Sequence, residues 1–216
     1  MRYAAAQRVS SYGKRLASSG ASRVAHRYAL RRRRTLVAVL NRGGIAVIPT
    51  DTLYGIVARA ENPAAVRRLY SLRRKTRNKP FIVLLPNIRA LHRFGVAATA
   101  AQKKFLNTVW PGTVSVILPC ASEHLSYLHL GTQSLAFRVP KPKGLQALLK
   151  ETGPLVAPSA NPEGMEPALT MRKAKKYFGD AVALYVTGLV RRAPSSLVSL
   201  LGPTPTVIRR GTVKIS

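Results

Sequence analysis

From Thr35 onward the sequence alternates short apolar runs with longer amphipathic runs, and Gly, Pro or Asn stands at most of the junctions. Short apolar runs bounded by breakers are typical of buried strands, whereas longer periodic runs are typical of helices. This alternation predicts a mixed α/β domain. The expected strands are 45–48, 81–85, 113–118, 134–139, 155–157, 183–186, 197–200 and 206–210, and the expected helices are 35–41, 63–74, 87–94, 100–109, 144–150 and 170–178.

The chain has 216 residues, of which 46% are hydrophobic, and this is enough apolar material for the core of one domain. We predict that residues 35–216 form that domain and that residues 1–34 form a basic N-terminal extension, rich in Arg, Ser and Ala and without an acid. Such a segment fits a disordered basic arm on a cytoplasmic protein, and it equally fits a mitochondrial transit peptide. We expect a cytoplasmic protein and keep the mitochondrion as the alternative.

The charge of the chain narrows the class of partner. Lys and Arg number 36 against 7 Asp and Glu, which gives a formal net charge of +29. A surface this basic attracts polyanions, with nucleic acid and an anionic membrane surface as the two candidates. No apolar run approaches the roughly 20 residues that a membrane-spanning helix needs. A single cysteine and four scattered histidines do not have the spacing of a metal site, so metal-dependent hydrolysis is not expected.

Polar and cationic side chains follow several of the expected strands and helices, at residues 49–55, 73–80, 137–140 and 157–161. Ligands of α/β proteins bind at strand ends, and cations with hydroxyl and amide donors suit a triphosphate and a small carboxylate. The basic cluster at 73–80 has a second interpretation, since cations are also favourable at a solvated helix C-terminus.

These same segments carry a family resemblance. The run Gly43-Gly44-Ile-Ala-Val-Ile-Pro-Thr-Asp-Thr-Leu-Tyr-Gly55 resembles the opening motif of the YrdC/TsaC family, the threonylcarbamoyl-AMP synthases. Five further blocks resemble family motifs in the same order, over about residues 35–214. They are the basic block with Lys79-Pro80 within 72–85, Trp110-Pro111-Gly112, residues 135–140, Ser159-Ala160-Asn161, and the closing pair of residues 194–198 and 208–211.

The resemblance implies a YrdC-like twisted mixed sheet, flanked by helices, around a positively charged concave cavity. It also implies a nucleotidyltransferase that makes threonylcarbamoyl-AMP and pyrophosphate from L-threonine, bicarbonate and ATP for the t6A modification of tRNA. Mg²⁺ would arrive on the ATP phosphates, and the partners would be tRNA or the t6A transferase complex. The alternative, from another functional class, is a non-catalytic basic protein that binds tRNA or double-stranded RNA and keeps this fold.

Residue roles follow from the same resemblance. Neither a nucleophile nor a general base is expected, and Arg73, Lys75 and Arg138 would position the substrates. The family usually shows Lys-x-Arg where this chain has Arg73-x-Lys75. Tyr54 is expected either at the floor of the site or in the core with a backbone partner for its hydroxyl. The residues expected to bind threonine are Thr52, Arg138, Ser159 and Ser195, and those expected to bind ATP are Arg73, Lys75, Lys79, Ser134, Asn161 and Arg209.

Overall fold

The computed structural model describes residues 32–74, 79–191, 193–211 and 213. The chain divides into two units, Met1–Ala38 and Val39–Ser216. In the first unit the described residues, 32–38, are helical, and in the second unit residues 39–41 are helical. It ends where Gly43 adopts a φ of +78° and donates its N–H to the carbonyl of Leu40 at 3.0 Å. A left-handed glycine of this kind is a common helix stop, as the sequence predicts.

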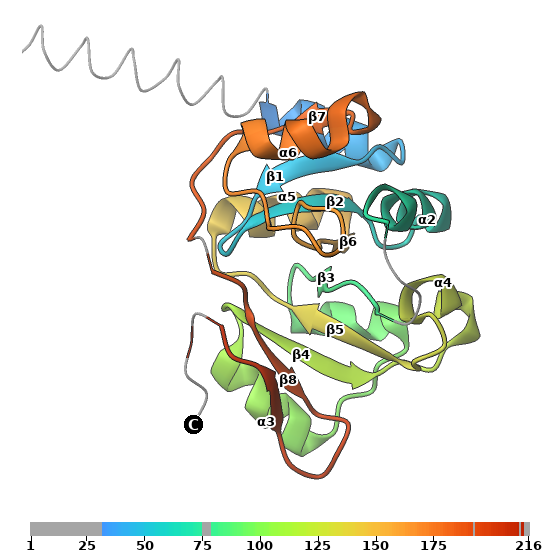
Figure 1. Ribbon diagram of the computed structural model, residues 1–216. Helices are drawn as coiled ribbons and strands as arrows, with labels where there is room; N and C mark the ends of the chain where they lie inside the picture. The colour runs from blue at the N-terminus through green and yellow to red at the C-terminus, as the bar shows by residue number, and fades with distance from the viewer. Residues whose placement is uncertain (1–31, 75–78, 192, 212, 214–216) are drawn as a thin grey trace, which may run out of the picture. The chain divides into compact units, whose positions relative to one another are not determined.

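The second unit is built on one mixed sheet of nine strands (Figure 1). The order across the sheet is β7-β1-β2-β6-β3-β5-β4-β8-β9. The pairs β1–β7, β3–β5 and β4–β8 are parallel, and the other neighbours are antiparallel. The strands are β1 (Ala46–Pro49), β2 (Tyr54–Arg59), β3 (Val83–Leu84), β4 (Val114–Pro119), β5 (Ser134–Arg138), β6 (Leu155–Val156), β7 (Leu184–Tyr185), β8 (Ser196–Ser199) and β9 (Thr206–Arg209).

The helices begin at side-chain caps that the sequence supplies. At α2, Asn62 Oδ1 accepts the N–H of Ala65 at 3.0 Å and Pro63 occupies the first turn, where no N–H is needed. At α3, Thr99 and Gln102 form a reciprocal capping box. The helices are α2 (Pro63–Leu72), α3 (Ala100–Val109), α4 (Ser126–His129), α5 (Lys143–Thr152) and α6 (Met171–Phe178), with 3-10 turns at Ile88–Phe94, Glu123–Leu125 and Gly179–Ala181.

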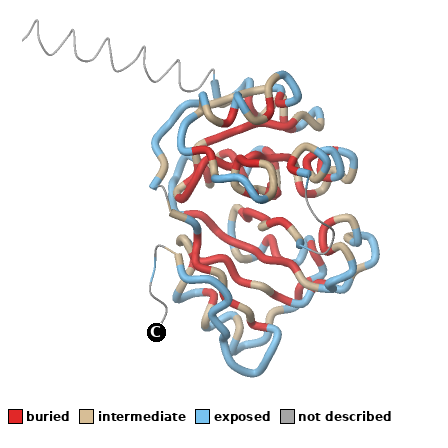
Figure 2. Tube along the Cα trace, in the orientation of Figure 1, coloured by how far each residue is buried: buried red, intermediate tan, exposed pale blue. Residues whose placement is uncertain are grey.

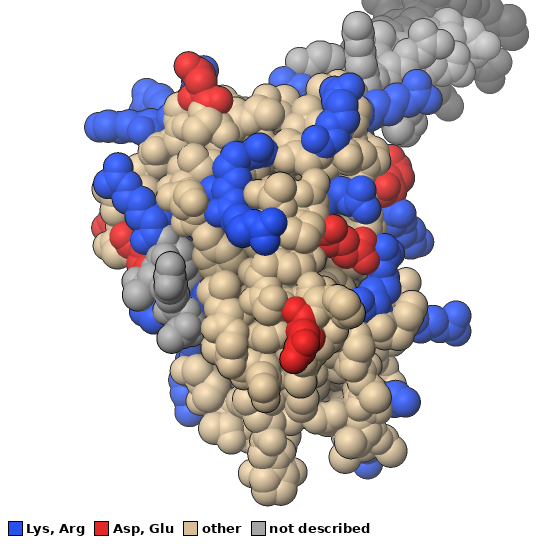
Figure 3. Space-filling view, turned by 90° about the vertical axis from the view of Figure 1, so that its right-hand side faces the viewer, with Lys and Arg blue, Asp and Glu red and all other residues tan. Residues whose placement is uncertain are grey.

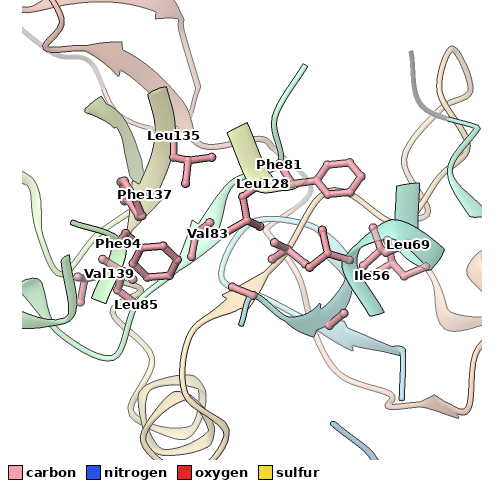
Figure 4. Close-up of a cluster of buried hydrophobic side chains, with 14 of the residues drawn as sticks. Ile56, Leu69, Phe81, Val83, Leu85, Phe94, Leu128, Leu135, Phe137 and Val139 are labelled. Carbon is pink, nitrogen blue, oxygen red and sulfur yellow. The ribbon is translucent and has the colours of Figure 1, made fainter. Parts of the chain in front are cut away.

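The core of this unit is apolar and lies along the middle strands, where the chain is almost wholly buried (Figure 2). Phe94 and Phe137 meet edge to face with ring centroids 5.2 Å apart, and Leu85 and Val139 lie beside them (Figure 4). None of the helices in the described part of the chain has the length and apolarity that crossing a membrane requires.

Two strands differ from the expectation. Residues 54–59 form β2, which the sequence interpretation left within a loop motif, because a strand with five successive buried residues lacks the alternation that marks a half-buried strand. The expected strand 81–85 shortens to β3. Prolines at 80 and 86 flank it and have no N–H to donate to a neighbouring strand.

The predicted division at residue 34 stays a prediction, because residues 1–31 lie outside the described residues.

Candidate active site

A cavity of about 360 Å³ opens where residues from both halves of the sheet converge. Of the ten residues expected to bind substrates, eight line it: Thr52, Arg73, Lys79, Ser134, Arg138, Ser159, Ser195 and Arg209. Asn161 does not belong to the lining, and Lys75 lies outside the described residues. Segments that are far apart in the sequence therefore meet in one place, as the family resemblance implies.

The β1–β2 turn supplies two threonine hydroxyl groups, and their hydrogen bonds show which of them donates and which accepts. Thr50 Oγ1 donates to the carbonyl of Leu53 at 2.7 Å, and it lies 3.0 Å from Thr52 Oγ1. Because the Thr50 proton is already used, Thr52 is the donor in the second bond. The lone pairs of Thr52 Oγ1 remain to accept hydrogen bonds from a ligand in the cavity.

Ser159 comes to the cavity through backbone pairing with the beginning of β2. Gly55 and Ser159 form an antiparallel bridge, and the N–H of Ala160 donates to the carbonyl of Tyr54 at 2.8 Å. The hydroxyl of Ser159 makes no hydrogen bond to the described residues and is available to a ligand. Tyr54 meets both of its expectations, since it lines the cavity while its hydroxyl donates to the carbonyl of Gly188 at 2.7 Å.

Arg138, at the end of β5, is held by a buried ion pair. Its Nη1 donates to Asp51 Oδ1 at 2.5 Å, and the two side chains are only 4% and 6% exposed. Nη1 also lies 3.4 Å from the carbonyl oxygen of Gly112. A guanidinium fixed in this way is oriented in advance, and the N–H groups of Nη2, which these bonds do not use, can donate to a carboxylate.

Ser195 and Arg209 form a second cluster across β8 and β9. Arg209 donates through Nε and Nη2 to the carbonyl of Ser195, at 3.2 and 3.0 Å, and burial lowers the pKa of this guanidinium. Ser195 Oγ lies 3.0 Å from Ser115 Oγ in β4. Gly211 allows this arrangement, because a Cβ there would lie 2.4 Å from the carbonyl oxygen of Pro194.

Arg73 follows α2 and is fixed by the segment that contains Asn161. Its Nε donates to the backbone carbonyl of Asn161 at 2.7 Å, and its guanidinium lies 5.6 Å from the centre of the Phe81 ring. Burial lowers the pKa of Arg73 to about 10, so the side chain stays charged at neutral pH. The side-chain amide of Asn161 donates to the carbonyls of Pro162 and Met165, at 2.8 and 2.7 Å, so its contact with Arg73 is made by the backbone carbonyl.

The remaining lining groups are more open to solvent. The side chain of Lys79 is 67% exposed and lies 3.5 Å from Glu163, while Ser134 Oγ lies 3.5 Å from Thr132 Oγ1. Four cations thus line the cavity, and its described lining contains no Asp, Glu, His or Cys. Such a lining can bind anions and orient them; it does not present a nucleophile paired with a base.

Comparison with known proteins agrees with this geometry. The model of the Sua5/YciO/YrdC family, described as "Telomere recombination", matches residues 38–211. The chain belongs to this family. A Sua5/YciO/YrdC relative from Thiobacillus denitrificans, named threonylcarbamoyl-AMP synthase, is 33% identical over 76% of this chain and 89% of its own length. A second relative of that name, from Bacillus subtilis, is 31% identical over 82% of this chain and 52% of its own length.

The fold is also that of the Sua5/YciO/YrdC family. A crystal structure of P. abyssi Sua5 complexed with L-threonine superposes on the chain with a TM-score of 0.77 at 23% identity, and it covers 83% of this chain and 54% of the other. The twisted mixed sheet that the resemblance implies is therefore the fold of this protein.

Two polar residues beside the cavity were not predicted from the sequence. Asp51 lies inside a motif quoted for the resemblance but received no role there. Ser115 stands between two valines near the beginning of β4 and is fully buried. A hydroxyl inside an apolar strand needs a hydrogen-bond partner, and that requirement was the available signal.

Proposed function

We propose that this protein is a threonylcarbamoyl-AMP synthase, which makes its product and pyrophosphate from L-threonine, bicarbonate and ATP for the t6A modification of tRNA. The relatives that carry this name support an enzyme. The observation that carries the proposal is the convergence of eight of the ten expected residues on one cavity.

Threonine is a zwitterion with a hydroxyl, and the cavity offers a partner to each of its groups. Arg138 receives the carboxylate, because a guanidinium binds it through directed, charge-assisted hydrogen bonds. Thr52 Oγ1 accepts a hydrogen bond from the substrate's amine or hydroxyl, because its own proton is already donated to Thr50. Ser159 and Ser195, which also line the cavity, complete the threonine site in this proposal.

The reaction needs positioning more than it needs a protein nucleophile. Bicarbonate takes up a proton and divides into carbon dioxide and water, while the ammonium of threonine gives up a proton to become a neutral amine. The amine nitrogen then bonds to the carbon dioxide and loses a second proton, which gives a carbamate. A carbamate oxygen then bonds to the α-phosphorus of ATP while the bond to pyrophosphate breaks. Both reacting groups belong to substrates, so the protein contributes orientation and charge.

Cations and hydroxyls around the cavity bind the nucleotide in this proposal. Arg73, Lys79 and Arg209 offset the negative charge that grows on the departing pyrophosphate, and Ser134 donates to a phosphate oxygen. Asn161 acts through Arg73, whose Nε its backbone carbonyl accepts. Lys75 keeps the role that the resemblance gives it, as a further phosphate ligand.

Mg²⁺ enters the proposal with ATP. Carboxylates are the protein ligands that Mg²⁺ prefers, and the described lining contains none. We therefore assign the ion to the ATP phosphates, where it supplies further compensation for their charge.

The product is consumed on tRNA, and the charge of the protein suits such a partner. On the face in Figure 3, Lys and Arg side chains are spread over the upper and middle parts, while the lower part carries few charges. A chain with a net charge of +29 would be drawn to the tRNA phosphates or to a transferase that already holds tRNA. The cytoplasmic location, with the mitochondrion as alternative, stays a prediction.

The test is pyrophosphate release that requires threonine, bicarbonate and ATP with Mg²⁺. In Ser159→Ala, kcat/KM for threonine should fall about tenfold or more, the value of one lost hydrogen bond to a charged group. The fold should not change, because the Ser159 hydroxyl makes no hydrogen bond within the part of the chain that the structure describes. Ser126→Ala, at an exposed hydroxyl on α4, is the matched control. Folded protein that releases no pyrophosphate, yet binds tRNA with a steep salt dependence, would instead be the non-catalytic RNA-binding protein.

A further inference from the structure

Asp51 stands behind the threonine site without belonging to the cavity lining. It is buried, and the partner that its carboxylate contacts is Arg138. Two buried atoms of this pair, Asp51 Oδ2 and Arg138 Nε, have no hydrogen-bond partner among the described residues. Buried polar atoms left unpaired are uncommon, and they concentrate at sites kept for function.

The pairing decides which nitrogen of Arg138 a ligand can reach. Nη1 is occupied by Asp51 and Gly112, and Nε is buried. Nη2 has no partner among the described residues and is not one of the buried unpaired atoms, so it is the nitrogen through which Arg138 lines the cavity. Asp51 thus sets the rotation of the guanidinium plane and turns Nη2 toward the substrate.

A buried guanidinium without a counter-ion would turn toward solvent or toward any carbonyl within reach, because an unpaired buried charge is costly. With Asp51 in place the orientation exists before substrate arrives, so threonine binds without reordering this side chain. We propose that Asp51 is a positioning residue for the threonine carboxylate, acting through Arg138 and not through contact with substrate. This inference rests on the proposed function, since it takes threonine as the ligand.

The test measures binding without turnover. Calorimetry gives the Kd of L-threonine, of L-threoninamide, which lacks the carboxylate, and of a non-hydrolysable ATP analogue. In Asp51→Asn the threonine Kd should rise about tenfold, while the Kd for threoninamide and for the ATP analogue should change less than about twofold. Asp180→Asn is the matched control, because Asp180 is the other aspartate of the chain and lies exposed outside the cavity.

The outcomes separate the two proposals. A merely structural Asp51 would lower the melting temperature of Asp51→Asn but leave the ratio of threonine to threoninamide affinity unchanged, and that result would overturn the inference. Wild-type protein that binds no threonine would overturn the proposed function instead. If Asp51→Asn does not fold, Asp51→Glu decides the question. Asp51→Glu keeps the charge opposite Arg138 but moves the carboxylate by one methylene. The ratio of threonine to threoninamide affinity should therefore fall in this variant too.

Discussion

The hydroxyl pair between Ser115 and Ser195 allows a quantitative test of how β4 and the β8 segment cooperate at the cavity. Ser115 is fully buried, and the hydrogen bond that its hydroxyl makes goes to Ser195 Oγ at 3.0 Å. Ser195→Ala therefore leaves a buried hydroxyl unpaired, which should lower the free energy of unfolding by about 1–3 kcal/mol. Ser115→Ala should cost less, about 0.5–1 kcal/mol, because Ser195 Oγ still accepts from Arg209 Nη2 at 3.3 Å.

The double variant Ser115→Ala/Ser195→Ala completes the cycle. Its loss should be smaller than the sum of the single losses by about 1 kcal/mol, because removing both hydroxyls leaves neither one unpaired. Urea unfolding followed by the fluorescence of Trp110, the one tryptophan of the chain, measures all four proteins. Additive losses, or equal losses from the two single variants, would refute the reasoning. Only Ser195→Ala should also raise KM for threonine.

Three further predictions concern the core, the thiol and the open edge of the cavity. Phe137→Ala removes the ring packed against Phe94 and should lower the free energy of unfolding by about 3–5 kcal/mol, measured with urea. Burial raises the pKa of Cys120, so iodoacetamide should alkylate it more slowly than free cysteine. The free energy of unfolding should also fall as the pH rises past the ordinary thiol pKa, because the unfolded chain loses the thiol proton before the folded chain does. A thiol that reacts as fast as free cysteine in folded protein would contradict this. Lys79→Met should leave stability within about 1 kcal/mol, since the Lys79 side chain is 67% exposed, yet raise KM for ATP; an unchanged KM would remove Lys79 from the nucleotide site.

Local patterns in the sequence predicted most of the elements. The caps at Asn62 and the glycine stop at Gly43 sit where the expected helices begin and end. The strands that were predicted correctly are short apolar runs, most of them bounded by Gly, Pro or Asn. The strand at residues 54–59, β2, was not predicted. The chain enters it directly from a polar turn, and a fully buried strand has no alternating pattern that would indicate it.

The candidate site was predictable residue by residue but not contact by contact. The family motifs identified the lining, while the bonds that orient it join residues distant in the chain. Asp51 and Arg138 are 87 positions apart, and Ser115 and Ser195 are 80 apart. No periodicity or local spacing records such pairs, because they exist only after the strand order of the sheet is set.

The way three arginines of the cavity lining are held explains how such a site can orient anionic groups. Arg138 is held by the Asp51 carboxylate, Arg73 by the carbonyl of Asn161, and Arg209 by the carbonyl of Ser195. Two of these three holders are neutral backbone oxygens, so they orient the guanidinium without cancelling its charge. Burial lowers the pKa of Arg73 only to about 10, which leaves it charged at neutral pH. In the proposed function, Arg73 and Arg209 therefore face the ATP phosphates with their charge not cancelled by the groups that hold them. In the same proposal Asp51 balances the charge of Arg138, so the threonine carboxylate meets a guanidinium whose charge is already partly offset.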